Sequence, residues 1–400
     1  DAGLARCGLA LAAAGTLLAF SRGQNDAFGL PKLFVLTLGA AAAWAALATG
    51  SGQDGRALRP TRLDLPILGM GAAILASLWA SPDPFVGIVG KYSIHAYGAG
   101  AFALCAAVYF ATACSREPED PEFLLSVALA AGAAVGAYAV LQGLGIEPFP
   151  GPARGGGGLR PGSTQGDPVP LGACLLMLLP LAARRFSTPL GAVCAVFSAA
   201  GLLFTLSRGA WLGAACGLLF YAAASGRLHW RAFDPRLRWA WGLGAAGVLA
   251  AVLALAGLLR PTKASDSARI ELWRSTPGIL RESPWLGGGP DTFQTALRKH
   301  RTEAFARILG PRASQVTAHN DFLQVLCTLG VIGFMAYLWL LYAVAVTLRE
   351  GLNDPARRDL AAAIGGALLG LFVQAKFNPV PLAAMTLASV CAGLLARAPA

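Results

Sequence analysis

Apolar runs of about 20 residues recur along the whole chain, and they constrain the fold more than any other feature. About 20 residues is the helix length that crosses the hydrocarbon core of a bilayer. The backbone of a spanning segment finds no water to bond to, so each run is expected to be a helix. Only 13% of the residues are charged, against about 25% in soluble domains, and 56% are hydrophobic. The sequence therefore predicts an all-α polytopic membrane protein.

Twelve runs fit this pattern, and one polar stretch separates the ninth run from the tenth. The predicted spans are 3–20, 31–50, 63–80, 93–113, 122–144, 167–183, 188–206, 209–225, 238–259, 320–348, 358–375 and 379–396. This divides the chain into 1–259 with nine spans, a loop domain at 260–318, and 319–400 with three spans. Within the loop we expect one short helix that stops before Pro277 and a second, amphipathic helix capped by Asp291.

The distribution of Lys and Arg predicts the orientation. With the N-terminus inside, the cytoplasmic segments hold fifteen Arg, and the short outer loops hold seven Lys or Arg. The positive-inside rule then places both termini in the cytoplasm and 260–318 outside, which is the periplasm if the cell is Gram-negative. In a membrane protein the net charge of +11 indicates contact with anionic headgroups or phosphates rather than with nucleic acid.

A histidine marks the junction between the loop and the tenth span. His319 precedes Asn320 and Asp321, either of which can cap the next helix. The free N–H groups and dipole at a helix start favour an anion such as phosphate. A neutral imidazole is also suited to take a proton from a hydroxyl. The sequence leaves open whether His319 acts as a base or as a phosphate ligand.

Several cations are candidates for binding phosphate. Arg208 lies between two apolar spans, where an Arg side chain faces a cavity or snorkels to the interface. The planar guanidinium binds phosphate through two parallel hydrogen bonds. Arg298 and Arg301 lie on the basic face of the second loop helix. That face is either solvated and close to lipid phosphates or a collar for a substrate phosphate.

The motifs around these residues resemble those of the O-antigen ligase family. His319-Asn320, followed by Gly330 and Gly333, resembles its His-Asn…Gly-x-x-Gly signature. Upstream, 269–273 and 282–293 resemble Arg…Trp and Pro-x-x-Gly-x-Gly segments that O-antigen polymerases share. The segment 207–211 resembles the family's Arg between two spans. The segment 160–168 resembles Arg…Gly-Thr/Ser-x-Gly-Asn-Pro, with Asp167 in place of the Asn.

The resemblance implies a glycosyltransferase of GT-C type that takes a glycan from undecaprenyl pyrophosphate at the periplasmic face. The acceptor would be lipid A–core for a ligase or another lipid-linked glycan for a polymerase, and the spacing after His319 favours a ligase. By motif, the catalytic residues would be His319, Arg208 and Arg269, and Arg160 and Asn320 would bind substrate. Lys91 in a short outer loop is a further candidate for binding substrate. No metal or cofactor is expected, because the outer loops offer isolated acids and the Arg side chains would neutralise the diphosphate.

A transporter or flippase of a lipid-linked glycan is the alternative from another functional class. Such a protein is expected to show two related halves, with broken helices at matching positions. The sequence shows neither feature, because the single long loop at 260–318 has no counterpart in the first half.

Overall fold

The computed structural model describes residues 2–21, 23–50, 60–91, 94–114, 120–149, 160–226, 263–310 and 312–397. Within these ranges the chain is helical and contains no strand. The helices are α1 (Ala2–Leu18), α2 (Gly29–Gly50), α3 (Asp64–Trp79), α4 (Pro84–Val89), α5 (Ala99–Cys114), α6 (Asp120–Gly143), η1 (Ser163–Gln165), α7 (Pro168–Arg184), α8 (Pro189–Phe204), α9 (Arg208–Ala224), α11 (Lys263–Glu282), α12 (Phe293–His300), α13 (Glu303–Leu309), α14 (Asp321–Asn353), α15 (Arg358–Ala375) and α16 (Leu382–Ala396).

Helices occupy eleven of the twelve predicted spans, and the remaining segment, 238–259, lies outside the described residues. Four of the described helices are long and apolar enough to cross a membrane by length and composition. They are Gly29–Thr49, Asp120–Gly143, Asp321–Asn353 and Arg358–Ala375. The all-helical fold is thus confirmed for the described residues, and the four long apolar helices are consistent with a membrane protein, whereas twelve spans remain a prediction.

The bundle is built around α7. Its residues from Leu171 to Ala182 are buried on every face, including Leu175 and Leu176, which have no exposed surface. A helix that is apolar all round is stable only when other helices surround it. Helices α6, α8, α9 and α15 pack around α7 and bury this surface.

Glycines bring two pairs of helices into backbone contact. A Cβ on Gly8 of α1 would lie 2.5 Å from the backbone nitrogen of Ala43 in α2. Likewise, a Cβ on Gly213 or Gly217 of α9 would lie 2.4 Å from a carbonyl oxygen of α15. Lipid tails are as apolar as Leu, so helices in a membrane associate through this close packing of small residues.

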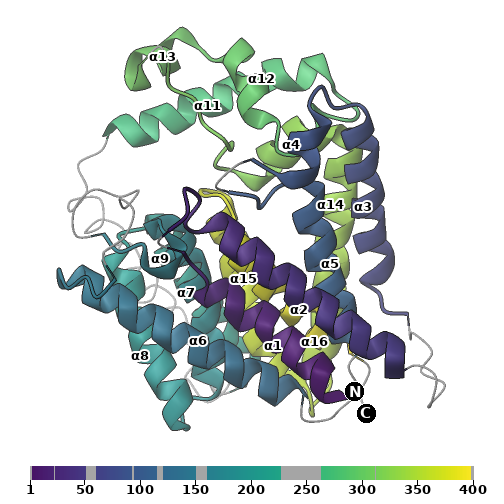
Figure 1. Ribbon diagram of the computed structural model, residues 1–400, viewed down its shortest axis with the longest axis vertical. Helices are drawn as coiled ribbons and strands as arrows, with labels where there is room; N and C mark the ends of the chain where they lie inside the picture. The colour runs from purple at the N-terminus through teal and green to yellow at the C-terminus, as the bar shows by residue number, and fades with distance from the viewer. Residues whose placement is uncertain are drawn as a thin grey trace, which may run out of the picture.

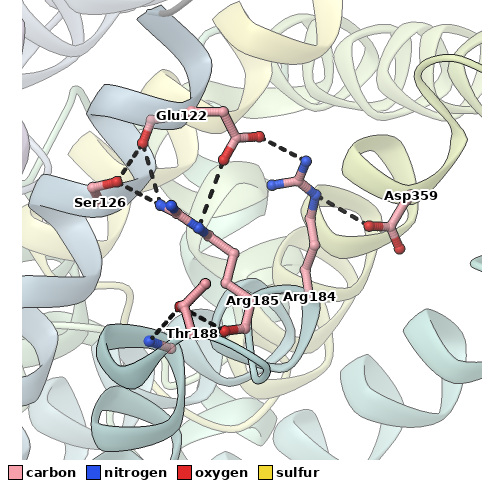
Figure 2. A network of polar contacts seen from close by, with 7 residues as sticks. Glu122, Ser126, Arg184, Arg185, Thr188 and Asp359 are labelled. Carbon is pink, nitrogen blue, oxygen red and sulfur yellow. Dashed lines mark hydrogen bonds and ion pairs between the residues drawn. The ribbon is translucent and has the colours of Figure 1, made fainter.

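The two ends of the bundle differ. Helix α1 begins and α16 ends at one end, which we call the terminal end, and α11–α13 form a layer across the opposite end, the loop end (Figure 1). At the terminal end, Glu122 of α6 accepts from Arg184 of α7 at 2.6 Å, and Arg184 also pairs with Asp359 of α15 at 3.3 Å. Arg185 bonds to Ser126 in the same network (Figure 2). The terminal end is therefore joined by charge–charge contacts between three helices.

The first loop helix is longer than the sequence indicates. Helix α11 continues through Pro277 to Glu282, so the prediction that it stops before Pro277 is wrong. Proline removes the N–H that would bond to the carbonyl of Trp273. The hydroxyl of Thr276 donates to that carbonyl at 2.7 Å and satisfies it.

The second loop helix is two helices. Helix α12 ends at His300, and α13 begins after Thr302, whose side chain accepts from the N–H of Phe305 at 3.0 Å. Asp291 does not cap α12, because its N-cap is Thr292. The apolar face packs inward, where Phe293 and Phe305 join Leu272, Ile279, Leu297, Ala318 and Cys327 in one buried cluster. The layer is therefore anchored on α14 through its own small core.

Candidate active site

A break in α14 receives the segment Pro284–Gly289. Gly330 has φ 66° and ψ −167° in the middle of the helix, which frees main-chain groups on both sides. The N–H groups of Gly288 and Gly289 donate to the carbonyls of Cys327 and Thr328 at 3.0 and 2.9 Å. The N–H groups of Val331 and Ile332 donate to the carbonyls of Pro284 and Trp285 at 2.8 and 3.2 Å. The loop backbone thus bonds to two carbonyls before the break and to two N–H groups after it.

The glycines of both motifs are required by this contact. A Cβ on Gly330 would lie 2.3 Å from the carbonyl oxygen of Trp285, and one on Gly287 would lie 2.3 Å from the carbonyl carbon of Thr328. Gly330 is the point where the helix is interrupted, and no pattern in the sequence predicted a break there.

His319 lies just before this broken helix in a fixed conformation. Its φ of 52° is in the left-handed region, and its neighbours hold it there. The indole N–H of Trp273 donates to the carbonyl of Ala318 at 2.9 Å, and the N–H of Ala318 donates to the side-chain oxygen of Gln324 at 2.8 Å. Asn320 caps α14 by accepting from the N–H of Leu323 at 3.1 Å. Helices α11 and α14 together therefore position the imidazole.

The imidazole of His319 is uncharged at neutral pH. Burial and, as the smaller cause, the nearby guanidinium of Arg269 together lower its pKa to about 4. Its Nδ1 atom is buried and has no hydrogen-bond partner among the described residues. A neutral ring with an open nitrogen can accept a proton or bond to a substrate.

A cavity of about 680 Å³ opens on one side of His319 and is lined by cations. Arg269, Arg160 and Lys32 line it together with Asp26 and Asp167. The carboxylate of Asp26 accepts from the N–H of Gly29 at 2.7 Å and pairs with His95 at 3.1 Å. Asp167 accepts from the N–H of Val169 at 2.8 Å and caps α7, a task that Asn performs equally well.

Each cation of this cavity is held by oxygen atoms of the main chain or a side chain. Arg160 donates to the carbonyl of Thr205 at 2.9 Å, and Arg269 donates to the side chain of Asn378 at 3.2 Å. Lys32 donates to the carbonyls of Ala19 and Thr164, both at 2.6 Å. These bonds fix three positive groups around one space, as recognition of a polyanion requires.

Arg208 is the first residue of α9 and is not among the residues that line the cavity. Its neighbour Gly209 lies close to Asn378, and a Cβ on Gly209 would be only 2.5 Å from the Asn378 amide nitrogen. Asn378 in turn binds Arg269. The structure thus brings the α9 N-terminus next to the Arg269 contact.

Of the other predicted ligands, only Asn320 lines a cavity beside His319. The side chain of Arg301 donates to the carbonyl of Ala313 at 3.3 Å, and that of Arg298 is exposed. The backbone N–H of Lys91 donates to the carboxylate of Asp291. None of these three cations lines either of the two cavities beside His319. Asn320 lines the smaller one and donates to the carbonyl of Lys376 at 3.2 Å.

A smaller cavity, with a volume of about 280 Å³, also borders His319. Its surface is mostly apolar and comes from α3, α5, α14 and α16, through residues such as Ile74, Phe102 and Leu340. His319, Tyr97, Thr317, Pro379 and Val380 border both cavities. The imidazole of His319 therefore borders both the larger cavity, which is lined by cations, and the smaller, mostly apolar cavity.

Sequence reasoning missed Lys32, Asn378, Asp291 and Gln324. Lys32 was counted only as an outer-loop charge, although a lone Lys near the start of an apolar helix is a recognised sign of a functional group. Asp291 was interpreted as a helix cap. No pattern in the sequence singled out Asn378 or Gln324, whose positions depend on the packing of distant helices.

Two comparisons with known proteins bear on this site. No curated protein matches the chain. Residues 193–338 match the family model described as O-antigen ligase. The match includes Arg208, Arg269, His319 and Gly330, which is the region where the motifs are specific. Together with the apolar helices, it indicates an integral inner membrane protein of lipopolysaccharide biosynthesis. Residues 193–338, just over a third of the chain, are therefore similar to the O-antigen ligase family.

Proposed function

We propose that the protein is an O-antigen ligase-type glycosyltransferase that moves a glycan from undecaprenyl pyrophosphate to lipid A–core. The larger cavity is the observation that carries this proposal, because it places three fixed cations beside a neutral imidazole. We further propose a GT-C-like arrangement of twelve spans, with the loop end in the periplasm and both termini in the cytoplasm. The loop 260–318 and the helices on either side would act as the three parts predicted from the sequence.

The cations would bind the diphosphate of the donor. As the bond between the anomeric carbon and the phosphate oxygen breaks, the electron pair goes to that oxygen, and negative charge grows on the leaving group. Arg269, Arg160 and Lys32 surround the space where this charge would develop, and fixed cations stabilise it more in the transition state than in the bound substrate. Arg208 would add a fourth cation near the Asn378 contact.

His319 would take the proton of the acceptor hydroxyl as the new glycosidic bond forms. A pKa of about 4 makes it a weak base in the empty site. A bound diphosphate would raise that pKa, because negative charge favours the imidazolium and offsets burial and Arg269. Donor binding would therefore activate the base. In the alternative role, His319 donates a hydrogen bond to the diphosphate.

A transfer assay in lipid nanodiscs with EDTA tests this proposal. The assay supplies undecaprenyl-pyrophosphate glycan and lipid A–core and compares the wild type with His319→Gln, Arg269→Gln and Arg307→Gln. Arg307 is the control, because it lies in the same layer with an exposed side chain. We expect wild-type and Arg307→Gln transfer to be equal, and losses of about 100-fold or more in the other two variants.

The product identifies the reaction. Transfer to lipid A–core establishes a ligase, and longer lipid-linked chains without transfer to core establish a polymerase. A requirement for a divalent metal would contradict the metal-independent chemistry. Donor that stays intact but exchanges between the two leaflets would refute a transferase and favour the flippase alternative.

A further inference from the structure

The smaller cavity contains three buried polar atoms that no described residue satisfies. They are Oδ1 of Asp291, Nε2 of Gln324 and Nδ1 of His319. All three residues line this one cavity, and Asp291 and Gln324 are only 2% and 7% exposed. Buried polar groups in native proteins are nearly always paired, so three open ones around one space indicate a ligand with matching groups.

The two side chains beside the histidine are held from behind. One carboxylate oxygen of Asp291 accepts from the backbone N–H of Lys91, which leaves the other oxygen open. The oxygen of the Gln324 amide accepts from the N–H of Ala318, which leaves the NH2 open. The cavity thus presents one fixed acceptor and one fixed donor.

An acceptor and a donor together fit a hydroxyl group, which donates one bond and accepts others. Burial raises the pKa of Asp291 to about 6, and its hydrogen bond from Lys91 works in the opposite direction. At pH 7.5 the carboxylate is therefore mostly ionised and accepts strongly. Most of the remaining surface is apolar, and Asn320, Asp321 and Asn378 line the cavity as well.

We propose that the smaller cavity is the acceptor subsite and that it holds the attacking hydroxyl, with Asp291 accepting from that hydroxyl and Gln324 donating to it. This rests on the proposed glycosyl transfer and names the residues that would hold its acceptor. The subsite brings the hydroxyl to His319. The single hydroxyl proton bonds to Asp291 in the bound acceptor and passes to the imidazole only as the glycosidic bond forms.

A pair of probes that differ only in the hydroxyl tests the subsite without catalysis. Binding of 4-fluorobenzyl alcohol and 4-fluorotoluene to protein in nanodiscs is measured by fluorine NMR at pH 7.5, with empty nanodiscs as the blank. We expect the wild type to bind the alcohol about tenfold more tightly than the hydrocarbon. Equal binding of the two would mean that water satisfies the polar atoms as well as a hydroxyl does, and it would overturn the proposal.

Two isosteric variants reverse the polarity of the open atoms. Asp291→Asn keeps an oxygen for Lys91 and turns an NH2 to the cavity, and Asn tolerates the φ of 54° at this position. Gln324→Glu keeps an oxygen for Ala318 and turns a second oxygen to the cavity. Each variant should lose the preference for the alcohol. Asp83→Asn is the matched control, because Asp83 caps α4 and Asn caps equally well.

The same variants in the transfer assay separate the two proposals. Asp291→Asn should raise the KM for the acceptor about tenfold and leave the KM for the donor unchanged. An unchanged acceptor KM would overturn the subsite even while transfer continues. If the wild type prefers the alcohol probe but transfers no glycan, the subsite stands and the proposed function fails.

Discussion

Replacing Gly330 by Ala should separate the loop layer from α14. A residue with a Cβ at a φ of 66° costs about 1–2 kcal/mol. The new Cβ would also lie 2.3 Å from the carbonyl oxygen of Trp285, so the docked segment must move. Four backbone hydrogen bonds join this segment to the helix, and each contributes about 0.5–1.5 kcal/mol. If all four are lost, the total cost is about 3–8 kcal/mol.

Gly145→Ala is the control, because it measures the cost of a Cβ at a positive φ without a steric clash. Gly145 has a φ of 84°, and a Cβ there would meet nothing within 4 Å. The entropy of unfolding of about 2 cal/mol/K per residue implies about 1 °C per kcal/mol for a chain of this length. We therefore expect the melting midpoint in detergent to fall by about 4–9 °C for Gly330→Ala and by about 1–2 °C for Gly145→Ala.

Limited proteolysis locates the damage. Arg281 is exposed directly before the docked segment, so trypsin should cut after it faster once the segment is released. Equal shifts for the two variants, with unchanged cleavage at Arg281, would refute the idea that the loop backbone completes the broken helix.

Three other predictions concern the rest of the structure. The folded pKa of His319 is below its unfolded value, so the native state should lose up to about 3 kcal/mol of stability as the pH falls from 6.5 to 4. Between pH 7.5 and 4.5 the melting midpoint of His319→Gln should therefore fall less than that of the wild type. Equal falls in the two melting midpoints would contradict a buried, neutral imidazole. Thr276→Val leaves the Trp273 carbonyl without its partner and should cost about 1 kcal/mol, visible as a shift of about 1 °C that Thr276→Ser does not show. Glu122 is nearly half exposed, so Glu122→Gln should lower the free energy of unfolding by less than about 1 kcal/mol, and the difference from the wild type should vanish in about 0.5 M NaCl. A larger loss of stability that does not depend on salt would contradict this prediction.

The sequence predicts the helices well because membrane spans are defined by a strong local signal. A run of apolar residues must be helical wherever it lies in the bilayer, so eleven segments could be located before any contact was known. The loop was harder. A proline such as Pro277 normally ends a helix. Here the hydroxyl of Thr276 bonds to the carbonyl that the proline leaves unpaired, and hydropathy patterns do not predict such a single contact.

The site was predictable only where a motif named a residue. His319 and Arg269 were identified by motif, and the structure places both along the larger cavity. Asp291 and Gln324 were not identified, because their open atoms matter only once α14 and the loop meet across the apolar cavity. Arg298 was expected from its place on a basic helix face, and it is exposed away from both cavities. Helix periodicity tells which residues share a face, but not what that face meets.

The joint between the loop and α14 has a consequence for how such sequences can change. Its four hydrogen bonds run between main-chain atoms, so they demand room at Gly287 and Gly330 but no particular side chain at Trp285, which is 66% exposed. Random replacement of the segment should therefore tolerate wide chemical variety at 285 and 286 and almost none at the glycines. A protein engineer could exchange the outward-facing side chains here, for example to attach a label, without disturbing the cavities that border His319.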